Sequence, residues 1–144
     1  MTAANPFVRL LNDHPIVFFH LVTALGALVL GTVLMLRSKG TGSHRALGWT
    51  WVALMASTAV ASAFIRDYRL PNLAGFTPIH FFTVFVAYML PRGIWYARQG
   101  NVVAHRQTMQ GLFRGACVIA GLFTLLPGRF LGSVLWKNVM PLIH

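Results

Sequence analysis

Four long apolar stretches alternate with short polar segments along the 144-residue chain. They cover about residues 15–36, 46–65, 76–97 and 107–127. A helix needs about 20 apolar residues to cross the hydrocarbon core of a bilayer, so each stretch is long enough for one crossing. We therefore predict an all-α fold: an integral membrane four-helix bundle formed by a single four-span domain over residues 1–144. The remaining segment, 128–144, is too short to span and is expected to lie as an interfacial tail.

The composition agrees with lipid as the surrounding solvent. Hydrophobic residues make up 56% of the chain and charged residues only 10%, whereas soluble domains carry about 25% charged residues. A net charge of +10 would suit nucleic acid if the basic residues formed one patch. They are instead spread between the apolar stretches. We therefore expect the lipid bilayer as a partner and no nucleic acid.

The basic residues also predict an orientation. The loops after the first and third stretches, taken with the end of the third stretch, carry six of them and no acidic residue: Arg37, Lys39, Arg45, Arg92, Arg98 and Arg106. The other side carries five, together with both aspartates, Asp13 and Asp67. Cytoplasmic loops are enriched in Lys and Arg, which places these two loops inside and both termini outside.

The chain contains a degenerate internal repeat. The first copy reads HPIVFFH…LRSKGTGSHR and the second reads TPIHFFT…ARQGNVVAHR, with an offset of 60 to 63 residues. Gly40 aligns with Gly100, and the pair His44-Arg45 aligns with His105-Arg106. We interpret the copies as two parallel two-helix repeats, related by a pseudo-two-fold axis along the membrane normal.

The repeat places four histidines in two pairs. His20 and His80 lie near the outer ends of the first and third stretches, and His44 and His105 lie at the inner side. Neutral imidazole is a common ligand of haem iron and of copper, and facing helices of a bundle supply such ligands inward. The layout resembles that of transmembrane b-type dihaem cytochromes. It predicts a haem b-binding redox or electron-transfer protein in which all four histidines are metal ligands.

Two alternatives to haem stay open for these histidines. His105 and Met109 share a helix face at i,i+4, a soft-ligand pair that copper would accept, so copper is the second cofactor considered. The histidines could also be structural, or contact quinone or lipid, with no cofactor bound. No nucleophile–base–acid constellation is present in the sequence, and an enzymatic activity is not expected.

Arg114 interrupts the fourth apolar stretch. A charge inside a span costs about 2.5–3.5 kcal/mol on insertion scales, so we expect Arg114 to face the bundle interior or to snorkel. An anionic group, such as a haem propionate, a lipid phosphate or a quinone oxygen, would answer its charge. Gly111 and Gly115 flank it in a pattern that favours close helix packing. None of the four stretches contains an acidic residue, which argues against proton-coupled transport.

Four motifs resemble one bacterial family of membrane proteins, called domain of unknown function 2306. They are K-G-x3-H-R-x2-G at 39–48, I-H at 79–80, H-R-x2-M at 105–109 and A-G-x-F-T-x2-P-G-R at 120–129. The resemblance covers about residues 14–132. It implies a small, four-span, multi-pass protein of the bacterial inner (plasma) membrane, and it adds Arg129 to the candidate cofactor-binding residues. The family's activity is open, so the alternative to haem binding is a non-catalytic accessory or assembly subunit of a larger respiratory or photosynthetic membrane complex.

Overall fold

The computed structural model describes residues 6–65, 78–126 and 130–139, and nearly all of these residues are helical, with no strand among them. Three long helices are α2 (Pro15–Leu36), α3 (Gly42–Phe64) and α4 (Pro78–Arg98). A fourth helical run consists of α5 (Val102–Leu112), the π-helical segment η1 (Phe113–Ile119) and α6 (Ala120–Thr124). Two short helices, α1 (Pro6–Asp13) and α7 (Phe130–Val139), flank them. The predicted all-α class is confirmed for the described residues.

The helix boundaries depart from the apolar stretches where polar residues can begin a helix. The first stretch coincides with α2, which starts at Pro15 immediately after His14. α3 and α5 begin several residues before the second and fourth apolar stretches, because Thr41 and Asn101 cap them. α4 runs through Pro91 to Arg98, close to the end of the third apolar stretch. The short helix α1 was not predicted, although its segment has apolar residues at helical spacing.

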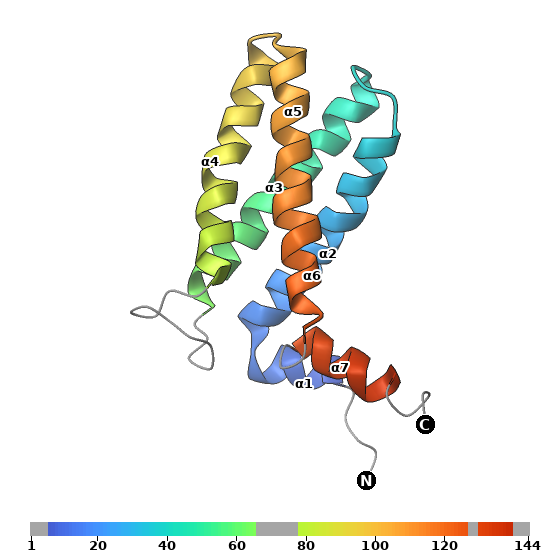
Figure 1. The fold of residues 1–144 in the computed structure, drawn as a ribbon, viewed down its shortest axis with the longest axis vertical. Helices are drawn as coiled ribbons and strands as arrows, with labels where there is room; N and C mark the ends of the chain where they lie inside the picture. Colours follow the sequence, from blue (N-terminus) through green and yellow to red (C-terminus); the bar gives the residue numbers. More distant parts are fainter. Residues whose placement is uncertain (1–5, 66–77, 127–129, 140–144) are drawn as a thin grey trace.

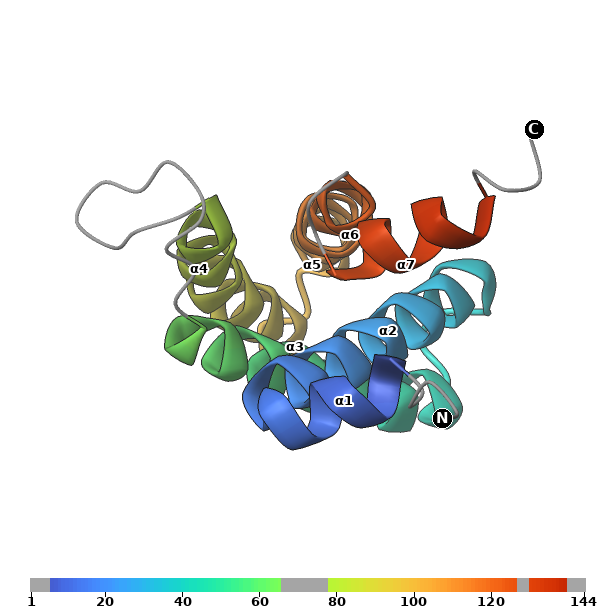
Figure 2. The same cartoon turned by 90° about the horizontal axis from the view of Figure 1, so that it is seen from below.

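The long helices form a closed ring of neighbours. α2 packs against α3, α3 against α4, and α4 against α5; the π-helical segment then contacts both α4 and α2. Figure 2 shows this ring end-on, with α2 and α3 on one side and α4 and α5 on the other. α3 and α5 are therefore opposite corners of the ring, as are α2 and α4.

Both short helices lie at one end of the molecule. In Figure 1, α1 and α7 lie at the bottom, whereas the α2–α3 and α4–α5 connections lie at the top. A chain that crosses the membrane an even number of times has its first and last segments on the same side, and the positions of α1 and α7 agree with this expectation. Which end faces the cytoplasm stays a prediction.

Side chains from all the long helices form the core. Its buried members are Ala27, Leu34, Trp51, Met55, Val86, Leu90, Leu112 and Cys117. The indole Nε1 of Trp51 donates a hydrogen bond to the carbonyl oxygen of Ala27 at 2.9 Å, which joins α3 to α2. Gly31 of α2 faces the rings of Trp51 and Phe113, and a Cβ there would lie 2.6 Å from Phe113. Glycine at position 31 therefore allows α2 to approach two aromatic rings closely.

Two of the described helices, α2 and α3, are long and apolar enough to cross a membrane. Only 17% and 22% of the residues in their most apolar windows are buried. A core helix of a soluble protein would be mostly buried, so these helices expose apolar surface. By length and composition, α2 and α3 are thus candidate spans at the positions of the first two apolar stretches. α4 contains Arg92 and Arg98, and the fourth run contains Arg106 and Arg114, which makes both helices less apolar.

Candidate functional site

Two helical hairpins with the same local geometry form one end of the molecule. Gly40 and Gly100 both have positive φ values, 82° and 72°, a conformation that glycine adopts without steric cost. The next residue in each hairpin caps the following helix: the side-chain oxygen of Thr41 accepts the N–H of His44 at 3.1 Å, and that of Asn101 accepts the N–H of Ala104 at 3.1 Å. The aligned residues of the sequence repeat therefore have matching structural roles.

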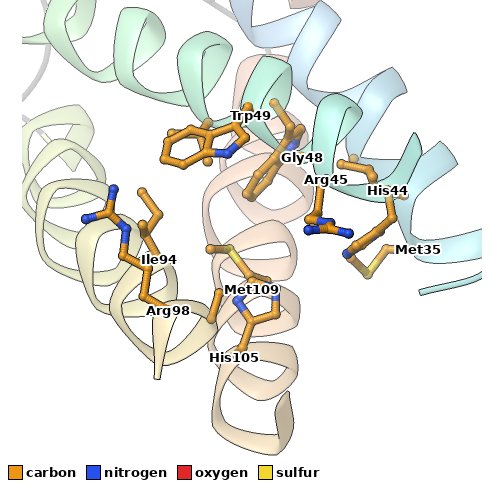
Figure 3. Close-up of a pocket in the computed structure, with 14 residues that line it drawn as sticks. Met35, His44, Arg45, Gly48, Trp49, Ile94, Arg98, His105 and Met109 are labelled. Atoms are coloured by element: carbon orange, nitrogen blue, oxygen red, sulfur yellow. The ribbon is translucent and has the colours of Figure 1, made fainter. Parts of the chain in front are cut away.

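These caps place His44 and His105 in the first turns of α3 and α5. Because α3 and α5 are opposite corners of the ring, the two histidines approach the middle of the bundle from opposite sides. Both line a single cavity of about 290 Å³. In Figure 3, His105 and Met109 extend from α5, and His44 and Arg45 from α3, toward the same space.

The lining of this cavity combines cations, thioethers and aromatic rings. The side chains that bring nitrogen or sulfur to the lining include His44, His105, Arg45, Arg98, Met35 and Met109. Trp49 and Trp51 complete the apolar wall, and Gly31 lies beside them. We call this the loop-end cavity. It contains the inner histidine pair that the sequence repeat predicted.

The ring orientation of His105 is fixed by a hydrogen bond. Its Nδ1 lies 2.9 Å from the carbonyl oxygen of Gly93. A carbonyl only accepts, so Nδ1 carries the proton and Nε2 keeps its lone pair. Metal-bound histidines typically donate their other N–H to a carbonyl or carboxylate in this way. Gly93 is buried and faces the end of the Met109 side chain, whose Cε would lie 2.5 Å from a Cβ at this position.

His44 has a buried ring nitrogen without a partner. Its Nδ1 is inaccessible to solvent and makes no hydrogen bond with any residue that the structure describes. Leaving a buried polar atom unsatisfied costs about 1–3 kcal/mol. A ligand that bonds to the imidazole, or turns it toward the cavity, would relieve that cost.

The cavity is electropositive. Arg45 and Arg98 line its rim, and no acidic residue is among its lining residues. The chain has only two aspartates, and the one that the structure describes, Asp13, ends α1 at the far end of the molecule. An anionic group at the cavity rim would therefore meet uncompensated positive charge.

The outer histidines occupy a different place. His20 on α2 donates from Nδ1 to the Thr58 carbonyl oxygen on α3 at 3.0 Å. The Thr58 hydroxyl in turn donates to the Thr23 hydroxyl at 2.9 Å. His80 lies in the first turn of α4, the corner opposite α2. Neither His20 nor His80 lines the loop-end cavity, and the described contact of His20 is with α3.

Arg114 does not face the core. It lies in the π-helical segment, and its side chain is exposed. The inward positions of that segment belong to Gly115, where a Cβ would lie 2.9 Å from the Phe85 ring, and to buried Cys117. The expected interior position of Arg114 is therefore wrong, because the small residues beside it occupy the packed face; an outward, snorkelling position remains. The other candidate arginine, Arg129, lies outside the described residues.

Some cavity residues were not named as candidates from the sequence. Met35 lies near the end of the first apolar stretch, and Arg98 lies in the loop used only for orientation. Arg45 was noted only as the neighbour of His44. Aligning the two hairpins brings the ends of all four helices together, but which side chains at those ends line the cavity depends on how each helix turns about its axis.

Comparison with known proteins supports the family assignment. The family model described as "Predicted membrane protein (DUF2306)" matches residues 17–127, more than half of the chain, and this range includes both cavity histidines. No curated protein matches the chain, and no solved structure matches it either. The resemblance seen in the sequence motifs is thereby confirmed. The chain belongs to the DUF2306 family of predicted membrane proteins.

Proposed function

We propose that this protein is a four-span, multi-pass protein of the bacterial inner membrane that binds haem b in the loop-end cavity and transfers electrons. His44 and His105 would hold the haem iron. The observation that carries the proposal is that these two histidines, from opposite corners of the ring, line one cavity. In transmembrane bundles, cofactor ligands come from facing helices in this manner.

The outward surface supports the membrane part of the proposal. Apolar side chains are exposed on all four helical runs: Val29 on α2 is 65% exposed, Val60 on α3 60%, Val84 on α4 68% and Leu122 on α6 61%. α4 and α5–α6 are less apolar overall, but their outward residues are of the same kind. Soluble monomers rarely expose apolar surface on every side, whereas a bilayer favours it.

The chemistry of the lining supports haem. The Gly93 carbonyl fixes the His105 proton on Nδ1 and leaves Nε2 for iron. Arg45 and Arg98 supply cations at the rim, where haem propionates need them. A haem with two imidazole ligands supplies one-electron transfer, and the residues of this chain would hold it, orient it and tune its potential.

A second haem between His20 and His80 is a further part of the proposal. The Thr58 carbonyl holds the Nδ1 proton of His20, which leaves Nε2 as its free nitrogen, as in His105. The proposal for His44 and His105 is supported by the cavity that both residues line. The proposal for His20 and His80 is supported only by the hydrogen bond of His20. One haem per chain would therefore support the inner site alone, and two haems per chain would support both sites.

Copper is the second candidate ligand, and the two methionines favour it. Met35 and Met109 line the cavity with the two histidines, and thioether with imidazole is a donor set suited to Cu(I). At about 290 Å³, the cavity is at the small end of ligand pockets, which run to about 1,000 Å³. A single ion needs less room than a porphyrin.

The test is the absorption spectrum and metal content of the protein purified after expression with ample haem precursor. We expect a Soret band and about one haem per chain for the inner site. His44→Ala and His105→Ala should each abolish that haem, whereas His14→Ala, at an exposed histidine whose side chain makes no capping hydrogen bond, should not. Copper with no Soret band would favour the second candidate. A protein with neither would overturn cofactor binding and leave the accessory or assembly subunit as the function.

A further inference from the structure

An arginine on the outer face of α4 is held between two tyrosines. The Nη1 of Arg92 donates to the Tyr88 hydroxyl at 2.7 Å, and its Nε donates to the Tyr96 hydroxyl at 3.0 Å. The guanidinium carbon also lies 5.6 Å and 5.5 Å from the centroids of the same two rings. Each tyrosine is four residues from Arg92, so one helix face supplies the whole arrangement.

The outward face of α4 changes character at this cluster. Below it, Phe81 is 71% exposed and Val84 is 68% exposed. At the cluster and beyond, the large exposed side chains include Tyr88, Arg92, Trp95 and Arg98. Tyrosine and tryptophan are enriched where a membrane protein passes from hydrocarbon into the headgroup layer. The apolar surface therefore ends at this level on α4.

The guanidinium keeps donors to spare. It has five N–H groups, and the tyrosines accept from two of them. Asp13, the one aspartate in the described residues, ends α1 at the opposite end of the molecule. The tyrosines also hold the side chain in one conformation, so it would lose less entropy when an anion binds.

We infer that Arg92, Tyr88 and Tyr96 form a binding site for the headgroup phosphate of an anionic phospholipid. Phosphate accepts the paired donors of a guanidinium, and the tyrosines place those donors at the level where lipid phosphates begin. None of the three residues lines the loop-end cavity, so the site is independent of the proposed haem. Its ligand is a lipid of the surrounding bilayer.

The test counts lipids that remain bound to the purified protein by native mass spectrometry, with phosphatidylglycerol and phosphatidylcholine offered in equal amounts. Arg92→Gln should weaken retention of phosphatidylglycerol about tenfold. The matched control is Arg37→Gln, which removes the same charge from the exposed C-cap residue of α2 at the α2–α3 connection. This variant should change retention less than about twofold.

Two further measurements separate a built site from bulk charge and from a free-phosphate site. The double variant Tyr88→Phe, Tyr96→Phe keeps the charge and should still weaken retention about threefold, because the guanidinium is no longer fixed. Inorganic phosphate should not displace the lipid. Equal losses from Arg92→Gln and Arg37→Gln, unchanged retention in the double variant, or displacement by inorganic phosphate would each overturn the inference.

Discussion

Gly31 gives the sharpest test of the packing that forms the floor of the loop-end cavity. A Cβ at this position would lie 2.6 and 2.7 Å from two ring carbons of Phe113 and 2.8 Å from Nε1 of Trp51. Trp51 is only 4% exposed, and its Nε1 is bonded to the Ala27 carbonyl. The ring cannot move away without breaking that hydrogen bond, so Gly31→Ala should be destabilising.

The same helix contains a matched control. At Gly26, a Cβ would lie 3.4 Å from a methyl group of Leu54, which is an ordinary contact. Both replacements gain about 1 kcal/mol of helix propensity, so this gain cancels when the variants are compared. The remaining difference is the cost of overpacking, about 1–3 kcal/mol. We therefore expect Gly31→Ala to be less stable than Gly26→Ala by about 2 kcal/mol.

The single cysteine of the chain supplies the assay. Cys117 is 8% exposed in the core, so a thiol-reactive fluorophore reports unfolding of the detergent-solubilised protein as temperature or denaturant rises. Gly31→Ala should unfold first, then the wild type, with Gly26→Ala equal to or above the wild type. If Gly31→Ala proved as stable as Gly26→Ala, the close packing of α2 on Trp51 and Phe113 would be refuted.

Three further predictions use the same protein. Thr41→Ala and Asn101→Ala each remove a helix cap and should cost about 1 kcal/mol in the thiol-labelling assay; no loss in either would mean that the hairpins do not depend on their caps. Ser62→Ala removes the 2.6 Å hydroxyl contact with Thr83 that joins α3 to α4 and should cost about 0.6 kcal/mol, the average for such bonds inside membranes, whereas a gain in stability would count against the contact. Alkaline phosphatase fused to the C-terminus should be active in cells if both termini face outside, and a fusion in the α2–α3 connection should be inactive; the reverse pattern would overturn the orientation.

The apolar pattern alone predicted the helices whose whole length is apolar. α2 matched because Pro15 begins it where the apolar stretch begins. α1 was missed because eight residues are too few for a span, although Leu10 is buried. The starts of α3 and α5 were placed too late, because a capped helix can begin with polar residues. Such ends are set by Thr41 and Asn101, which make local hydrogen bonds that hydropathy does not register.

The candidate site was predictable as far as the repeat reached. Aligned hairpins placed His44 and His105 at one level, and the structure puts both at one cavity. The lining by Met35 could not be predicted, because it depends on how α2 turns about its axis. The outward direction of Arg114 could not be predicted for the same reason, because the packing of the helices decides which side of each helix faces inward.

The π-helical segment has a consequence for how the two ends of the fourth helical run can vary. A π turn accommodates one more residue than an α turn. Deleting one residue within Phe113–Ile119 would therefore restore α-helical winding with little change in the facing of α6. The same deletion inside α5, which is regular α-helix, would rotate everything beyond it by about 100°. The segment is thus the part of the fourth helical run where the chain can lose a residue while the cavity end and the opposite end keep their relative facing.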